Sequence, residues 1–434
     1  MPAEHARRLN RQDYKTLSLA ALGGALEFYD FIIFVFFAAA IGQLFFPADI
    51  PEWLRQLQTF GIFAAGYLAR PLGGLIMAHF GDSQGRKKMF SLSILLMALP
   101  TLAMGLLPTY ASVGIAAPIL LLLLRVIQGA AIGGEVPGAW VFVAEHVPEN
   151  RVGFACGTLT SGLTFGILLG SLVATLIATT LSAQAVLDIG WRIPFLLGGG
   201  FGLLAMYLRR WLHETPVFTQ MKQRKALSDE LPLKTVVLRH KQAVVVSMLL
   251  TWLLSAGIVV VLLMAPALLQ KLHGLPAAMT LQANSLATVM LIIGCIIAGA
   301  LVDRIGASTT LIIGSLLLAM SSWAFFHIAA QAPAWLFIAY AIAGLCLGAV
   351  GVVPFIMVRA FPPEVRFSGI SFSYNVAYAI FGGLTPIALT LMLKLSPMAP
   401  AWYVLALAVM GLLVGCWLRG EGAKQTLLQQ VSQQ

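Results

Sequence analysis

Long apolar segments alternate with short polar ones along almost the whole chain. A membrane-crossing helix needs roughly 20 apolar residues, and about twelve segments reach that length. The pattern therefore predicts an all-α membrane protein with twelve transmembrane helices. We expect these helices near residues 17–40, 58–80, 89–107, 113–143, 154–181, 191–212, 241–269, 280–302, 309–328, 333–358, 367–393 and 400–418.

The longest polar segment follows the sixth predicted helix and divides the chain into two halves. We expect an amino-terminal six-helix bundle at 1–212 and a cytoplasmic linker at 213–240. A carboxy-terminal six-helix bundle would follow at 241–420, with a short cytoplasmic tail at 421–434.

The two halves carry similar motifs at similar places. Asp82 and Asp303 follow the second and the eighth predicted helices, and Arg151 and Arg366 lie in the loops before the fifth and the eleventh. The members of each pair are about half the chain apart. Such an internal repeat is typical of secondary transporters, so the two bundles are predicted to be pseudo-symmetric.

Composition and charge agree with a membrane protein. The chain is 59% hydrophobic and only 10% charged, whereas a soluble domain carries about 25% charged residues. The net charge of +10 comes mainly from loops on one side, which predicts cytoplasmic termini in a bacterial inner membrane rather than nucleic-acid binding. The four cysteines lie in apolar segments without a CxxC pair, and no nucleotide loop or catalytic set is visible, so no metal or cofactor is expected.

Several motifs together resemble the major facilitator superfamily, and in particular its metabolite:H+ symporter family. The motifs are GGALEFYDF in the first helix, LARPLGG at 68–74, GDSQGRKK at 81–88, LLLRVIQGAAIGGE at 122–135, WRIPF at 191–195, ETPVF at 214–218 and the run at 361–386. The resemblance implies a carrier that works by alternating access, commonly coupled to protons. Its known substrate classes include dicarboxylates, citrate, shikimate, and proline or betaine.

Acidic residues inside predicted helices are the candidates for proton coupling. Glu27 and Asp30 lie three residues apart, on one face of the first helix. A charge at bilayer depth costs at least about 2.5 kcal/mol, so intramembrane acids are functional by default. A structural ion pair is the alternative. Glu135 follows Arg125 by ten residues, about 15 Å along the helix; we expect either a proton-exit role or an ion pair with an arginine of the cytoplasmic side.

Arg125 and Arg70 are the candidates for binding a negative charge. Each lies about the middle of a predicted helix, and a guanidinium binds a carboxylate through two parallel hydrogen bonds. The alternative for Arg70 is a pairing with Asp30 or with a helix end.

Neutral and aromatic side chains complete the expected substrate site. Phe31 and Trp252 could pack on the substrate, and Tyr374 and Asn375 could donate hydrogen bonds from the carboxy-terminal half. For Trp252, Tyr374 and Asn375, each taken alone, the sequence favours helix packing over a substrate contact.

The repeated loops point to a conformational latch. The resemblance implies that Asp82 and Asp303 each brace two helices on the cytoplasmic side, paired with arginines and with helix amino termini. Arg86, Arg151 and Arg366 are the candidate partners.

We expect a monomeric transporter in the lipid bilayer that carries a small metabolite together with H+. The two arginines favour an organic acid anion, such as a di- or tricarboxylate. A zwitterion such as proline or betaine is the first alternative, because it would satisfy both an arginine and an acid. Export of a metabolite or drug by proton antiport is the second. An enzyme is not expected, since no nucleophile–base pair is found.

Overall fold

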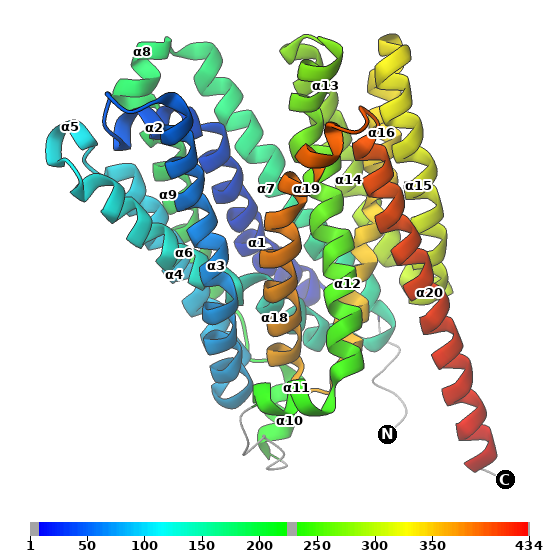
Figure 1. The fold of residues 1–434 in the computed structure, drawn as a ribbon. Coiled ribbons are helices and arrows are strands. Elements are labelled where there is room, and N and C mark those ends of the chain that lie inside the picture. The colour runs from blue at the N-terminus through cyan, green and yellow to red at the C-terminus, as the bar shows by residue number, and fades with distance from the viewer. Residues whose placement is uncertain (1–7, 224–231, 433–434) are drawn as a thin grey trace.

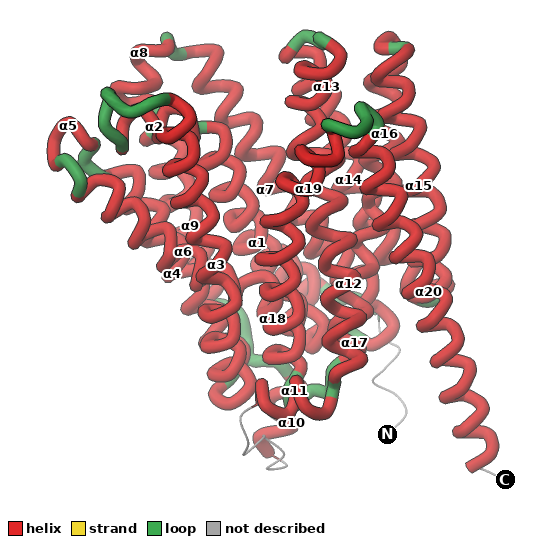
Figure 2. Tube along the Cα trace, in the orientation of Figure 1, coloured by secondary structure: helices red, strands yellow, loops and turns green. Residues whose placement is uncertain are grey.

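The chain folds into two helical bundles that stand side by side in a computed structural model, which describes residues 8–223 and 232–432 (Figure 1). Within these ranges every regular element is a helix (Figure 2). Eleven helices are long and apolar enough to cross a membrane, and a pair bent by 41° between Gly190 and Arg192 raises the number to twelve. The prediction of an all-α protein with up to twelve membrane-crossing helices is therefore confirmed.

The amino-terminal bundle is built from α1 to α9. Its elements are α1 (Arg11–Phe36), α2 (Ala38–Phe45), α3 (Glu52–Gln84), α4 (Arg86–Leu106), α5 (Tyr110–Val113), α6 (Ala116–His146), η1 (Glu149–Arg151), α7 (Val152–Thr180), α8 (Ala183–Ala185), η2 (Val186–Gly190) and α9 (Arg192–Arg209). Two short helices follow in the predicted linker, α10 (Pro216–Gln223) and α11 (Pro232–Arg239).

The carboxy-terminal bundle is built from α12 to α20. Its elements are α12 (Lys241–Ile258), η3 (Val259–Met264), α13 (Ala265–His273), α14 (Ala277–Ile305), α15 (Ala307–Gln331), η4 (Pro333–Trp335), α16 (Leu336–Leu347), η5 (Gly348–Val352), α17 (Val353–Ala360), α18 (Arg366–Ala377), η6 (Tyr378–Gly382), α19 (Gly383–Leu393) and α20 (Ala399–Ser432). The segment expected as a tail continues α20 to Ser432.

The start of α1 and the end of α20 lie at one end of the bundles, together with α10 and α11 (Figure 1). We call this end the terminal face. The short helices α2, α5 and α8 lie at the other end, which we call the opposite face. This arrangement agrees with an even number of crossings.

Small residues let α3 and α6 approach each other closely inside the amino-terminal bundle. A Cβ at Gly129 would overlap the backbone of Gly66, and one at Gly133 would overlap the carbonyl of Arg70. In a lipid bilayer no hydrophobic force drives helices together. Small residues at a crossing stabilise the pair instead, because they let the two backbones touch. The contact fixes the register of the two helices that carry Arg70 and Arg125.

The two bundles meet along two helix pairs that occupy equivalent places in the halves. In one pair α7 packs on α14, and in the other α18 packs on α3. Glycines again shorten the distance, because a Cβ at Gly157 would overlap Gly299. Side chains near these pairs can therefore contact both bundles at once.

Candidate functional site

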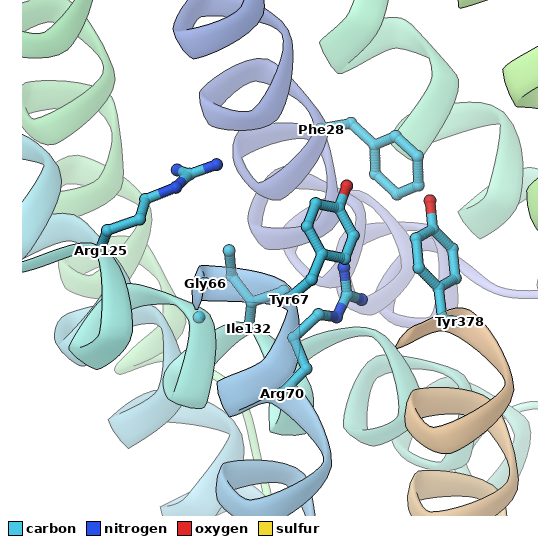
Figure 3. A pocket seen from close by; sticks show the side chains of 8 residues that line it. Phe28, Gly66, Tyr67, Arg70, Arg125, Ile132 and Tyr378 are labelled. Atoms are coloured by element: carbon cyan, nitrogen blue, oxygen red, sulfur yellow. The ribbon is translucent and has the colours of Figure 1, made fainter. Parts of the chain in front are cut away.

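A cavity lies where the two bundles face each other. It is nearly closed in this structure, since only about 20 Å³ is open to the centre of a water-sized sphere. Helices α1, α3 and α6 form most of its wall, and η6 of the other bundle completes it (Figure 3). The lining residues are Phe28, Gly66, Tyr67, Arg70, Arg125, Gly129, Ile132 and Tyr378. The structure thus brings both predicted arginines to one cavity.

Arg125 is joined to Asp30 through a glutamine. Arg125 Nη1 donates to Gln128 Oε1 at 2.5 Å, and Gln128 Nε2 donates to Asp30 Oδ2 at 3.1 Å. Thr101 Oγ1 also donates to Asp30 Oδ2, at 2.7 Å. All four side chains are buried. The acid and the base therefore belong to one network and interact electrostatically, with Gln128 holding the contact between them.

The Asp30–Arg125 network keeps unused hydrogen-bonding capacity. Within the described residues, Asp30 Oδ1 and Arg125 Nε have no hydrogen-bond partner. The guanidinium of Arg125 lies 4.6 Å from the ring centre of Phe34 and 5.2 Å from that of Phe63. Buried polar atoms normally find partners, so the unused atoms favour a ligand or a proton at this place.

Arg70 lies among tyrosine rings on the other side of the cavity. Its guanidinium is 4.5 Å from the ring centre of Tyr378, 5.5 Å from that of Tyr67 and 5.7 Å from that of Tyr374. Tyr67 and Tyr378 stack on each other across the bundle interface, with ring centres 5.9 Å apart. Arg70 Nε also reaches Asn375 Oδ1 at 3.5 Å. Arg70 therefore links α3 to the carboxy-terminal bundle.

The carboxy-terminal candidates divide between the bundle interface and the interior of their own bundle. Asn375 Nδ2 donates to the carbonyl of Gly133 in α6 at 2.7 Å, so this side chain joins the bundles. Trp252 stacks on Phe381 with ring centres 4.3 Å apart and donates to Tyr403 Oη at 3.2 Å. Trp252 does not line the cavity, because its ring packs inside its own bundle.

Glu135 forms a buried ion pair away from the cavity. Its two carboxylate oxygens lie 2.5 and 3.2 Å from the guanidinium of Arg209, and Ser93 Oγ donates to Oε2 at 2.5 Å. Both members of the pair are 0% exposed. Of the two alternatives for Glu135, this geometry favours the ion pair. The side chains of Glu27 and Phe31 lie outside the described part of the structure.

A first charged cluster joins the bundles near the terminal face. Asp82 Oδ2 accepts hydrogen bonds from the amide and the hydroxyl of Ser368, at 2.9 and 2.8 Å, and Asp82 Oδ1 lies 3.1 Å from Arg86. Arg86 in turn pairs with Glu145 at 3.3 Å, and Arg366 pairs with the same carboxylate at 3.1 Å. Arg366 was a candidate partner of an aspartate, but among the described residues its ion pair is with Glu145.

A second cluster repeats this arrangement in the other half. Asp303 accepts hydrogen bonds from the amides of Gly153 and Phe154, both at 2.8 Å. These amides belong to the first turn of α7, where the helix dipole favours a negative charge. No ion pair joins Asp303 to Arg151 within the part of the chain that is described. Asp303 thus contacts the helix end directly, while Arg151 and Arg359 interact with it electrostatically from a greater distance.

The family is decided by comparison with known proteins. The profile described as Major Facilitator Superfamily matches residues 20–386. The chain belongs to the Major Facilitator Superfamily. This match confirms the resemblance found in the sequence. The protein therefore belongs to a family of membrane transporters rather than to an enzyme family.

Several bacterial transporters resemble this superfamily member over nearly their full length. It is 33% identical to a putative proline/betaine transporter of Staphylococcus aureus (strain COL), over 95% of this chain and 90% of that protein. It is also 33% identical to the glycine betaine/proline/ectoine/pipecolic acid transporter OusA of Dickeya dadantii, over 94% of this chain and 84% of that one. A third relative at 33% identity is the proline/betaine transporter of Salmonella typhimurium, over 92% and 82%.

The fold is shared with a solved sugar transporter. The proton:xylose symporter XylE of E. coli, bound to 6-bromo-6-deoxy-D-glucose, superimposes with a TM-score of 0.77 and covers 94% of this chain and 95% of XylE. The sequences are only 19% identical, so this likeness establishes the fold alone.

Several residues that complete these clusters were not among the site candidates of the sequence. Gln128 lies three positions after Arg125, a spacing that places both on one helix face and could have revealed the pair. For Glu145 and Arg209, no spacing in the sequence pointed to their ion-pair partners. Their partners are far away in the chain, and Arg209 follows the pattern of an ordinary loop-side base.

Proposed function

We propose that this superfamily member transports a small zwitterion of the proline/betaine kind, driven by protons. The expectation of an organic acid anion is not supported, because the relatives at 33% identity are named for proline and betaine. This resemblance over more than nine-tenths of the chain is the observation that carries the proposal. The cavity supplies the chemistry.

The two ends of such a zwitterion have matching walls. Arg125 lies on one side of the cavity, and the rings of Phe28, Tyr67 and Tyr378 lie on the other, together with the guanidinium of Arg70 (Figure 3). A guanidinium binds a carboxylate, and aromatic faces bind alkylated ammonium groups by cation–π attraction. We therefore assign the substrate carboxylate to Arg125 and the ammonium group to the ring of Phe28, because Tyr67 and Tyr378 already contact the guanidinium of Arg70.

The proposed proton carrier is Asp30. A carboxylate that binds Arg125 neutralises the opposite charge nearest to Asp30 in the described network. Proton uptake by Asp30 would compensate for the added negative charge, because a buried charge without its partner is costly. Substrate and proton would then enter the cavity together. Glu27, three residues earlier on the same helix face, is retained as a second proposed carrier.

The orientation is proposed from charge. Basic residues such as Lys87, Lys88 and Arg210 lie at helix ends of the terminal face, which by the positive-inside rule would be cytoplasmic. The clusters of Asp82 and Asp303 would then act as latches that close the cytoplasmic side, as the family resemblance implies.

The test is uptake into proteoliposomes under an inward proton gradient. Glycine betaine, proline, citrate and a dicarboxylate are offered in parallel, with internal pH recorded. We expect betaine or proline to accumulate together with acidification of the interior. Accumulation of only the organic acids would overturn the substrate assignment, and accumulation without acidification would overturn the coupling.

A matched pair of variants links the result to the cavity. Arg125→Gln removes the proposed carboxylate ligand and should abolish accumulation. Arg210→Gln removes an exposed arginine whose side chain contacts only Tyr207 and Trp211 among the described residues, and should transport as the wild type does. Equal activity of the two variants would contradict the assignment of Arg125.

A further inference from the structure

A second hollow lies far from the transport cavity, at the terminal face of the carboxy-terminal bundle. Four membrane-crossing segments reach that face around it: one begins at Lys241, one begins at Ala307, one ends at Ala360 and one ends at Glu421. Residues from all four line an open groove of about 1,530 Å³. The groove therefore lies at the depth where lipid headgroups meet the protein.

The walls of this groove are predominantly basic. Arg239, Lys241 and Arg359 line it, and all three side chains are exposed. His240 and one acid, Glu421, line it as well. Within the described residues none of the three cations forms an ion pair with an acidic side chain. Three cations and one acid give the groove a net positive charge. Arg359 also donates to the carbonyl of Glu149 at 3.3 Å and interacts electrostatically with Asp303.

An apolar groove continues from the basic one along the membrane-crossing parts of α12 and α20. The two grooves share Lys241 and Trp417, among others, and the second is lined mainly by apolar side chains such as Val245, Leu249 and Leu413. It offers about 870 Å³. A charged cradle at headgroup depth therefore leads into an apolar channel that runs toward the bilayer core.

Trp417 marks the junction of the two grooves. Its side chain is 41% exposed, and tryptophan is enriched where membrane and water meet, since its ring is apolar and its N–H is polar. The first turn of α12 lines the same place, and the positive end of a helix dipole attracts anions. Both features match a ligand with an anionic head and an apolar chain.

We propose that these grooves bind an anionic phospholipid such as phosphatidylglycerol. The phosphate would lie between Arg239, Lys241 and Arg359, and one acyl chain would follow the apolar groove between α12 and α20. Basic pockets between membrane-crossing helices are suited to anionic headgroups, whereas a water-soluble anion would have no use for the apolar part. The site is independent of the transported substrate.

Trp417 supplies the probe for a direct test. The full-length protein is reconstituted with phospholipids that carry bromine on one acyl chain, a quencher of indole fluorescence. The contribution of Trp417 is obtained by comparing the wild type with Trp417→Phe, since the chain holds nine tryptophans. We expect brominated phosphatidylglycerol to quench this contribution at a much lower mole fraction than brominated phosphatidylcholine does.

Two variants separate a specific site from general attraction. Lys241→Gln combined with Arg359→Gln should raise the phosphatidylglycerol fraction needed for half quenching about 25-fold, at roughly five-fold for each charge. Lys88→Gln removes an exposed lysine from the start of α4, also a helix that begins at the terminal face, and should change nothing.

Three results would overturn the proposal. The first is equal quenching of Trp417 by the two lipids. The second is a preference for phosphatidylglycerol that survives in the double variant. The third is relief of the quenching by millimolar glycerol 3-phosphate, which would mark a site for a soluble anion.

Discussion

Replacing Glu135 by glutamine tests whether this buried acid is structural or carries a proton. The change would leave Arg209 buried without its counter-charge, because both oxygens of Glu135 contact that guanidinium and both side chains are 0% exposed. Removing one member of a buried ion pair costs about 3–5 kcal/mol. Total stabilities are about 5–15 kcal/mol, so Glu135→Gln should lose a large part of the stability.

A double variant isolates the cause. Glu135→Leu with Arg209→Met removes both charges and keeps apolar side chains of similar length in place. Apolar replacement of a buried pair is often neutral or stabilising, so the double variant should unfold within about 1 kcal/mol of the wild type. Glu149→Gln serves as the matched control, because this carboxylate is exposed and its loss should cost less than about 0.5 kcal/mol.

The assay measures unfolding by denaturant in detergent and proton-driven uptake in proteoliposomes from the same preparation. If the pair is structural, stability falls in the single variant and both stability and uptake return in the double variant. The reasoning is refuted if Glu135→Gln keeps wild-type stability but abolishes accumulation. In that case Glu135 would be a proton carrier. A double variant as unstable as the single one would also contradict it.

Three further substitutions address the remaining site residues. Asp30→Asn keeps an acceptor for Gln128 but cannot bind and release a proton. Under a proton gradient of about two pH units, substrate accumulation should fall from as much as about 100-fold to none, while exchange of preloaded substrate persists. Loss of both activities would exclude Asp30 as the coupling site. Arg125→Lys replaces a planar fork by a point charge and should raise the half-saturation concentration at least about ten-fold, and an unchanged value would refute the assignment. Asp82→Asn weakens the contact to α18 and should favour the state that is closed toward the opposite face. A cysteine introduced into the cavity as Ile132→Cys should then react more slowly with an impermeant thiol reagent added at the opposite face. An unchanged rate would count against a latch.

The helices and their repeat could be predicted because membrane-crossing segments are long, apolar and separated by polar loops. The bracing of helix ends by Asp82 and Asp303 was implied by the family resemblance of the two loops. The partner of Glu135 could not be found in this way, since Arg209 is 74 positions away and follows the pattern of an ordinary basic loop residue. Trp252 was a candidate either for packing on the substrate or for helix packing; its ring stacks on Phe381, and the direction in which a side chain points is not encoded in hydropathy.

The two halves share a fold but divide the chemistry unequally. The chain from Asp30 through Gln128 to Arg125 lies wholly within the amino-terminal bundle, whereas the carboxy-terminal bundle contributes the neutral side chains of Tyr378 and Asn375. Rocking of one bundle against the other would break the contacts that these two residues make with the amino-terminal bundle, yet it would leave the charged chain intact. We infer that protonation of Asp30 influences the motion through the charge balance of the cavity, rather than through a rearrangement inside its own bundle.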